Sequence, residues 1–286
     1  MEQCFYNISE VSNLLSVSTD TLRRWDKKGK LTPIRHPINN YRVYHSEQLM
    51  IFEKFQLIKQ SHWEKEQLIK PSHKYTSIEL FAGCGGLALG LEKAGFNNIL
   101  LNEINKDASK TLKKNKPNWN VKNCDIHDLS FKKYKNKIDL VSGGFPCQSF
   151  SYAGNKLGLN DARGTLFFEF TRVIKEIQPK TFIAENVKGL LSHERGKTLE
   201  IIKSVLTDLG YIIIEPRVIQ AIYHKVPQKR ERLLIIGIRN DIYRDDVFKF
   251  PDPYSKVFTM KDALKKGELY PSDVPNSIGQ KYPEKK

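Results

Sequence analysis

The stretch TSIELFAGCGGLALGLEKA, residues 76–94, decides the fold of most of the chain. A strand-like run over residues 76–81 leads into Gly83, Gly85 and Gly86, and an apolar helical pattern follows over residues 87–94. Because glycine has no side chain, backbone N–H groups at the start of such a helix can face a ligand directly. The stretch therefore predicts a strand, a glycine turn and a helix that together bind a nucleotide-like cofactor.

The sequence beyond this stretch alternates between strand-like and helical runs. Strand-like runs occupy residues 99–101, 138–142, 181–184, 211–214 and 233–238, and helical patterns occupy residues 105–116, 166–177 and 197–209. Alternation of this kind is typical of an α/β fold with a mostly parallel, doubly wound, Rossmann-like sheet. Ligands of such sheets bind at the carboxyl ends of the strands, so the loops there are where we expect the chemistry.

An acidic residue, Glu103, ends the strand that follows the glycine turn. A carboxylate at this position suits the ribose hydroxyls of an adenosine cofactor. The turn by itself leaves NAD and S-adenosylmethionine open, because both present an adenosine ribose. A turn that serves only tight packing between strand and helix is the structural alternative.

The charge balance indicates a polyanionic partner. The chain has 286 residues, room for about two domains by the usual length prior, with 47 Lys and Arg against 32 Asp and Glu and a formal net charge of +15. Cationic side chains that neutralise phosphates release condensed counterions, so nucleic acid is the first expectation. A merely solubilising basic surface is the alternative.

The cysteines and the apolar runs bound the class of protein. Cys4, Cys84, Cys124 and Cys147 form no C-x-x-C pair, so we expect neither a metal site nor a disulfide framework. No apolar run approaches the roughly 18 residues of a membrane span, and the N-terminus lacks a targeting pattern. We therefore expect a cytoplasmic protein.

The first fifty or so residues predict a helical unit of their own. One apolar stripe contains Ile8, Val11 and Leu14, and a second, after a turn that Ser18 or Thr19 can cap, contains residues 17, 22 and 25. A polar turn at residues 39–40 precedes a short strand over residues 41–44, and a further helix begins near residue 46.

This unit resembles the DNA-binding module of the MerR group, a winged helix-turn-helix that ends in a similar Tyr-Arg-x-Tyr strand. The resemblance makes Arg23, Arg24 and Arg42 the first candidates for phosphate or base contacts. A generic helical bundle that dimerises or packs on the rest of the chain is the alternative. We divide the chain into a module at 1–56, a helical linker at 57–74 and a catalytic domain at 75–286.

Two motifs place reactive side chains at one edge of the predicted sheet. GGFPCQSFS, residues 143–151, follows one strand and contains Cys147, and ENV, residues 185–187, ends another and contains Glu185. A thiol and a carboxylate at the carboxyl ends of neighbouring strands can face one pocket.

Five motifs in order resemble the DNA cytosine-5 methyltransferase family: FAGCGG at 81–86, GFPCQSFS at 144–151, DARGTLFF at 161–168, ENV at 185–187 and QKRER at 228–232. The resemblance spans about residues 75–264. It implies S-adenosylmethionine as the methyl donor and double-stranded DNA as the partner, with the target cytosine extruded from the duplex.

The family's chemistry gives the residues their roles. Cytosine C5 is a poor nucleophile, so the thiolate of Cys147 must first bond to C6. Glu185 relieves the charge on the ring at N3, for which it must be protonated or share a proton with the base. Arg230 and Arg232 enter as positioning and electrostatic residues, not as proton donors. The base that removes the C5 proton is not readable from these residues.

The resemblance also implies contact residues. Those for the cofactor are Phe81, Gly83, Gly85, Gly86, Glu103, Ile104, Asp125, Ile126 and Pro146, and those for DNA in the catalytic domain are Gln148, Ser151 and Arg163.

Beyond QKRER the family's target-recognition region and closing blocks are not found. The chain therefore reads either as a fragment or as a subunit of a split enzyme whose second chain supplies recognition. The preferred function is an enzyme of a restriction-modification system. The alternatives are a DNA-binding regulator with a silent methyltransferase fold and a tRNA cytosine-5 methyltransferase. An NAD enzyme is disfavoured, because hydride transfer has no use for the Pro146-Cys147 loop.

Overall fold

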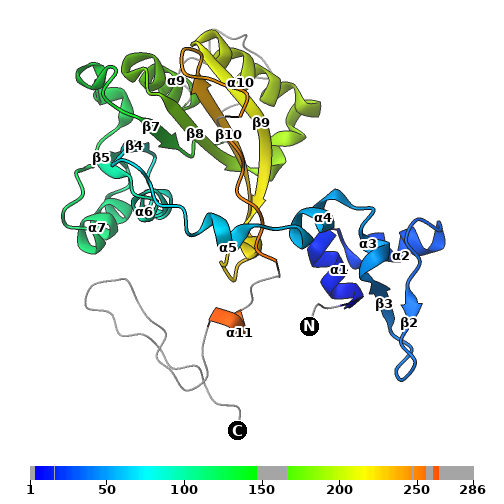
Figure 1. The fold of residues 1–286 in the computed structure, drawn as a ribbon. Coiled ribbons are helices and arrows are strands. Elements are labelled where there is room, and N and C mark those ends of the chain that lie inside the picture. The colour runs from blue at the N-terminus through cyan, green and yellow to red at the C-terminus, as the bar shows by residue number, and fades with distance from the viewer. Residues whose placement is uncertain (1–3, 16, 147–165, 247, 256–259, 264–286) are drawn as a thin grey trace.

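The computed structural model describes residues 4–15, 17–146, 166–246, 248–255 and 260–263. Two sheets organise them, one of seven strands and one of three. Figure 1 shows the small sheet and its helices to one side of the large sheet, joined to it by the segment that carries α5 (Trp63–Glu66). No helix in these ranges is long and apolar enough to cross a membrane.

The large sheet has the strand order β6-β5-β4-β7-β8-β10-β9. Its first five strands in this order pair in parallel, and β10 is antiparallel to both of its neighbours. The predicted α/β fold with a mostly parallel, doubly wound sheet is therefore confirmed. The strands are β4 (Thr76–Leu80), β5 (Asn97–Asn102), β6 (Val121–Lys122), β7 (Leu140–Gly143), β8 (Thr181–Val187), β9 (Tyr211–Gln220) and β10 (Glu231–Arg239).

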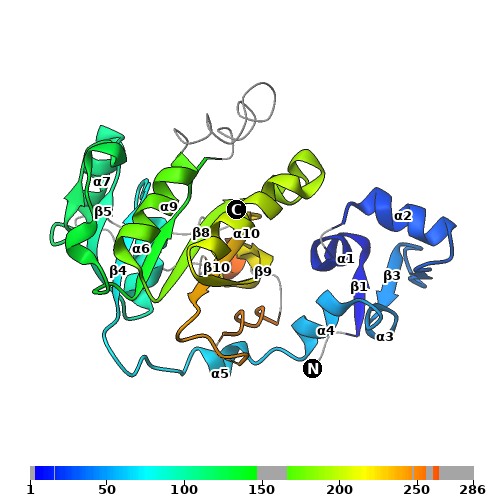
Figure 2. The same ribbon diagram turned by 90° about the horizontal axis from the view of Figure 1, so that it is seen from above.

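Helices cover both faces of this sheet. Neighbouring residues of β5, Leu100 and Leu101, belong to different hydrophobic clusters, and successive side chains of a strand point to opposite faces. The cluster with Leu100 includes residues of α9 (Leu166–Ile177) and α10 (Lys197–Asp208), whereas the cluster with Leu101 includes residues of α6 (Gly86–Lys93) and α7 (Lys106–Asn115). Figure 2 shows these helices around the sheet from above.

The short helical turns lie between these elements. They are η1 (Ile126–Asp128), η2 (Lys132–Tyr134), η4 (Lys188–Leu191), η5 (His193–Gly196) and η6 (Ala221–Tyr223), with α11 (Met260–Ala263) near the end of the described residues.

The N-terminal unit is a helix-turn-helix beside a small antiparallel sheet of order β1-β3-β2. Ser18 caps the second helix, because its hydroxyl accepts a hydrogen bond from the Thr21 N–H at 3.0 Å. The apolar stripes seen in the sequence form its core, in which Val11, Leu14 and Leu22 are buried. Its elements are β1 (Phe5–Asn7), α1 (Ile8–Leu15), α2 (Thr19–Lys27), β2 (Ile34–Arg35), β3 (Arg42–His45), α3 (Ser46–Leu49) and α4 (Glu53–Lys59).

Two strands extend further than their sequence patterns predict. β8 runs to Val187, so Glu185 lies inside the strand rather than after it, and β9 runs to Gln220. The reason is their common neighbour β10, whose residue Leu234 pairs with Glu185 and whose residue Glu231 pairs with Gln220. Backbone hydrogen bonds to a third strand stabilise extended structure beyond the apolar run that starts it.

Candidate active site and DNA-facing module

The glycine turn between β4 and α6 has a backbone that only glycine fits well. Gly85 has φ of 84°, and a Cβ on it would overlap the side chain of Leu112. A Cβ on Gly83 or Gly86 would instead meet no atom within 4 Å. The turn is thus packed tightly on one side and open on the other, which leaves room for a ligand against its backbone.

Glu103 is fixed to this turn. Its carboxylate accepts hydrogen bonds from the backbone N–H groups of Gly83 and Asn105, each at 2.7 Å, and its side chain is buried. Each carboxylate oxygen has a second lone pair, so both can still accept a hydrogen bond from a ribose hydroxyl. Ile104 beside it is 63% exposed, so its side chain is free to pack against the ring of a bound cofactor.

Asp125 and His127 form a polar pair at the start of η1, which follows β6. The Asp125 carboxylate accepts a hydrogen bond from the His127 N–H at 3.0 Å and lies 2.6 Å from the ring Nδ1 of His127. The backbone N–H and ring of His127 together hold the pKa of Asp125 below its ordinary value. Ile126 between them is buried. Sequence reasoning assigned no chemistry to His127, which the fold places against a proposed cofactor residue.

The carboxylate of Glu185 is clamped by the two arginines of the QKRER motif. Arg232 Nε lies 2.7 Å and Arg230 Nη2 3.5 Å from Glu185 Oε1. β8 and β10 are neighbouring strands, so residues from two distant motifs meet here. A Cβ on Gly144 would lie 3.1 Å from Glu185 Oε2, which shows that the GFPC motif begins directly against this carboxylate.

Asn186 anchors the backbone that leads into the GFPC motif. Its Nδ2 donates a hydrogen bond to the Phe145 carbonyl at 2.9 Å, and both residues are buried. Phe145 packs against Phe167 and Phe170 of α9. Sequence reasoning did not single out Asn186, although its place in the ENV motif was a signal.

Four predicted site residues lie outside the described residues: Cys147, Gln148, Ser151 and Arg163. Pro146 is the last residue described before them. The structure therefore brings together Glu185, Arg230 and Arg232 at the start of the motif that contains Cys147.

Two of the three predicted DNA-contacting arginines lie beside one hollow of the N-terminal unit. Arg23 and Arg42 line a hollow of about 510 Å³ together with Arg35 and Tyr41, which sequence reasoning missed. Arg42 also forms an ion pair with Asp26 at 3.3 Å, so its charge is shared within the unit.

Arg23 and Arg24 make their own local contacts on α2. Arg23 pairs with the exposed Asp20 at 2.6 Å, and Arg24 Nη2 donates to the Thr21 hydroxyl at 3.3 Å. Exposed pairs of this kind stabilise by less than about 1 kcal/mol, so both side chains can exchange these partners for phosphates.

The sequence matches two known protein families. Residues 75–283 match the family described as C-5 cytosine-specific DNA methylase, and residues 7–44 match the family described as MerR family regulatory protein. The first match covers more than half of the chain. The chain therefore belongs to the C-5 cytosine-specific DNA methylase family.

Curated relatives agree with this assignment. The chain is 57% identical to the type II methyltransferase M.Eco47II of Escherichia coli, over 98% of this chain and 67% of the relative. It is 53% identical to the type II methyltransferase M.PspPI of a Psychrobacter species, over 98% of this chain and 68% of the relative. About a third of each relative lies outside the match, and no comparison supports the separate second chain considered above.

Solved structures support the fold. A protein described as a DNA modification methyltransferase encoded within a prophage of E. coli matches with a TM-score of 0.54 and 27% identity, over 74% of this chain and 62% of that chain. DNMT2 of Spodoptera frugiperda, at 22% identity and a TM-score of 0.53, shows likeness of fold alone. With the family match, these findings define a DNA cytosine-5 methyltransferase.

Proposed function

We propose that this chain transfers a methyl group from S-adenosylmethionine to C5 of a cytosine extruded from duplex DNA, in a restriction-modification system, through a covalent bond between Cys147 and the base. The observation that carries the proposal is the clamp of Arg230 and Arg232 on Glu185, directly against the start of the motif that contains Cys147. It is the arrangement that the reaction requires, because a carboxyl group has to be held rigidly beside the base.

The edge of the sheet at β4 and β5 fits the cofactor. The open side of the glycine turn and the remaining lone pairs of Glu103 suit the sugar, and Ile104, Asp125 and Ile126 lie at the next strand ends for the adenine. When bound, S-adenosylmethionine supplies an activated methyl group. We assign Phe81 and Pro146 to the methionine end of the same pocket.

Glu185 is the group that this chain offers to the pyrimidine ring. A bond from the Cys147 sulfur to C6 pushes electrons toward C5 and onto N3, where Glu185 donates a proton or shares one with the base. Arg232 and Arg230 hold the carboxyl oxygen in place and stabilise charge there. After the methyl group has reached C5, a base takes the C5 proton and the electrons of that C–H bond re-form the C5–C6 double bond. The Cys147 thiolate then leaves C6, and the proton on N3 returns to Glu185.

DNA contacts come from both parts of the chain. We assign Gln148, Ser151 and Arg163 to the duplex around the extruded base, and Arg23, Arg24 and Arg42 of the MerR-like unit to additional phosphates or bases. The family matches at residues 7–44 and 75–283 support a division into module, linker and catalytic domain at 1–56, 57–74 and 75–286.

A trapping experiment tests the proposal. The chain is incubated with S-adenosylmethionine and a duplex in which 5-fluorocytosine replaces cytosine, because fluorine cannot leave as a proton and the covalent species accumulates. We expect a denaturation-resistant adduct between protein and DNA that the Cys147→Ser variant does not form. An adduct that persists in Cys147→Ser, or an adduct formed with tRNA and not with DNA, would contradict the proposal.

A further inference from the structure

The core of the N-terminal unit is completed by residues of the catalytic domain. Ile222 and Tyr223 of η6 are buried in the same hydrophobic cluster as Val11, Leu22 and Phe55. The Tyr223 hydroxyl also donates a hydrogen bond to the Asn13 carbonyl at 2.8 Å, across 210 positions of sequence. The unit is therefore packed onto the end of β9, and η6 is shared between the two parts.

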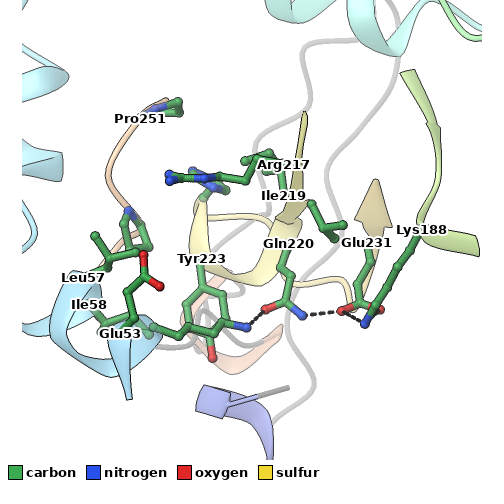
Figure 3. A pocket seen from close by; sticks show the side chains of 14 residues that line it. Glu53, Leu57, Ile58, Lys188, Arg217, Ile219, Gln220, Tyr223, Glu231 and Pro251 are labelled. Carbon is green, nitrogen blue, oxygen red and sulfur yellow. Dashed lines mark hydrogen bonds and ion pairs between the residues drawn. The ribbon is translucent and has the colours of Figure 1, made fainter. Parts of the chain in front are cut away.

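A series of polar contacts runs from this interface through Gln220 and Glu231 to Lys188, as Figure 3 shows. Lys54 of α4 donates a hydrogen bond to the side-chain oxygen of Gln220. The Gln220 amide donates to Glu231 at 2.6 Å, and Lys188 lies 3.1 Å from the same carboxylate. The contacts border a pocket of about 310 Å³ between α4 and the ends of β9 and β10.

Glu231 lies between the two arginines that clamp Glu185. Side chains alternate along an extended backbone, so Glu231 faces away from the side on which Arg230 and Arg232 meet Glu185. The backbone is tied in the same place, because the Ala221 N–H of η6 donates to the Arg230 carbonyl at 2.9 Å. Lys188 follows the ENV motif directly, so Glu231 also joins the two strands that form the clamp.

The pKa values of Glu231 and Lys54 are consistent with a stable series of polar contacts. Burial would raise the pKa of Glu231, but hydrogen bonds from Gln220 and Lys188 outweigh it and leave the pKa below its ordinary value. Glu231 is thus a carboxylate whose charge is stabilised by Gln220 and Lys188. Burial lowers the pKa of Lys54 to about 8, against the attraction of Glu231.

We propose that the N-terminal unit is a structural arm of the active site, in which Lys54, Gln220 and Glu231 are positioning residues for Arg230 and Arg232. The unit then has a second task besides binding DNA: it fixes the segment that holds the carboxyl group against the base. The inference rests on the proposed function only for the role of Glu185, since the connection itself is a property of the folded chain.

Hydrogen exchange of the QKRER segment tests the proposal without any need for catalysis. In Lys54→Met we expect the amides of residues 228–234 to exchange at least threefold faster than in the wild type, and Lys54→Arg to restore the wild-type rates. Lys65→Met is the matched control, because Lys65 is an exposed lysine of α5. Wild-type exchange of this segment in Lys54→Met, or the same acceleration in Lys65→Met or throughout the catalytic domain, overturns the proposal.

An alternative variant and a second readout complete the experiment. If Lys54→Met does not fold, Gln220→Met interrupts the same series of polar contacts at its middle residue and keeps a similar side-chain volume. We expect the same faster exchange of residues 228–234 in that variant. In the trapping assay we expect Lys54→Met to slow adduct formation at saturating DNA at least threefold with unchanged cofactor affinity. If the wild-type chain forms no adduct, the proposed function is wrong. The exchange rates of residues 228–234 still test whether Lys54 positions the QKRER segment.

Discussion

At the scale of single residues, Glu79 of β4 is the most unusual carboxyl group in the described part of the chain. It is 3% exposed, its Oε2 has no hydrogen-bond partner there, and neither has the hydroxyl of Ser142, its neighbour on β7. Burial raises the pKa of Glu79 to about 8, although a hydrogen bond from the Ala88 backbone opposes the rise. The group is therefore neutral in the folded protein at pH 7.

This burial predicts a pH-dependent stability that Glu79→Gln removes. The unfolded chain loses the Glu79 proton near the ordinary pKa of 4.5 and the folded chain near 8. The protein therefore has its full free energy of unfolding below pH 4.5, and this free energy falls as the pH rises to 8. Glu79→Gln stays neutral and should be more stable at pH 7 by about 1–3 kcal/mol, with little change at pH 4.5.

Urea unfolding at both pH values measures this difference. The matched control is Glu64→Gln, which changes an exposed glutamate of α5. A Glu79→Gln variant that is less stable than the wild type at pH 7 would show that the carboxyl group is ionised and paired in the folded protein.

The clamp on Glu185 predicts unequal effects of its two arginines. Arg232 lies 2.7 Å from Glu185 Oε1 and Arg230 3.5 Å. A lysine keeps the charge but loses the planar fork of donors. Arg232→Lys should slow single-turnover adduct formation by about 10- to 100-fold, and Arg230→Lys by less, with cofactor affinity unchanged in both. Equal effects of the two variants would mean that the clamp does not act through the geometry described.

At the scale of elements, α6 depends on the conformation of Gly85 at its first turn. Gly85→Ala forces a side chain into the space of Leu112 at φ of 84°, so we expect a loss of stability of about 1–3 kcal/mol and a shift of the turn. Cofactor affinity, measured by calorimetry, should fall at least tenfold. Gly90→Ala, in the same helix where a Cβ meets open space, is the control. Unchanged affinity in Gly85→Ala would separate this turn from the cofactor.

The elements show how far sequence patterns reach. The helix predicted at 166–177 and most strands are found because their apolar periodicity is local. The long ends of β8 and β9 were not predicted, since they depend on pairing with β10. The resemblance implied positioning and electrostatic roles for Arg230 and Arg232, but their contact with Glu185 was not predicted. The roles of Asn186 and Glu231 were missed because their partners lie on other strands.

At the scale of the whole molecule, the packing of η6 predicts that both parts unfold together. Tyr223 is 2% exposed and contributes to the core of the N-terminal unit. No local sequence pattern predicts this packing between the two parts of the chain. Calorimetry of the wild-type chain should show one cooperative transition. Tyr223→Ala removes a large buried side chain, at a cost of about 3–5 kcal/mol, and should give an earlier, separate transition for the unit. Two transitions in the wild type would contradict this coupling.

Analysis of the methylated product tests the central claim most directly. The chain is incubated with S-adenosylmethionine labelled in its methyl group and, separately, with duplex DNA and tRNA, and the nucleosides are then separated by mass. The account predicts label in 5-methylcytosine from DNA, and none with Cys147→Ser. Label on another base or on the exocyclic nitrogen of cytosine, label confined to tRNA, or an undiminished product from Cys147→Ser would contradict it.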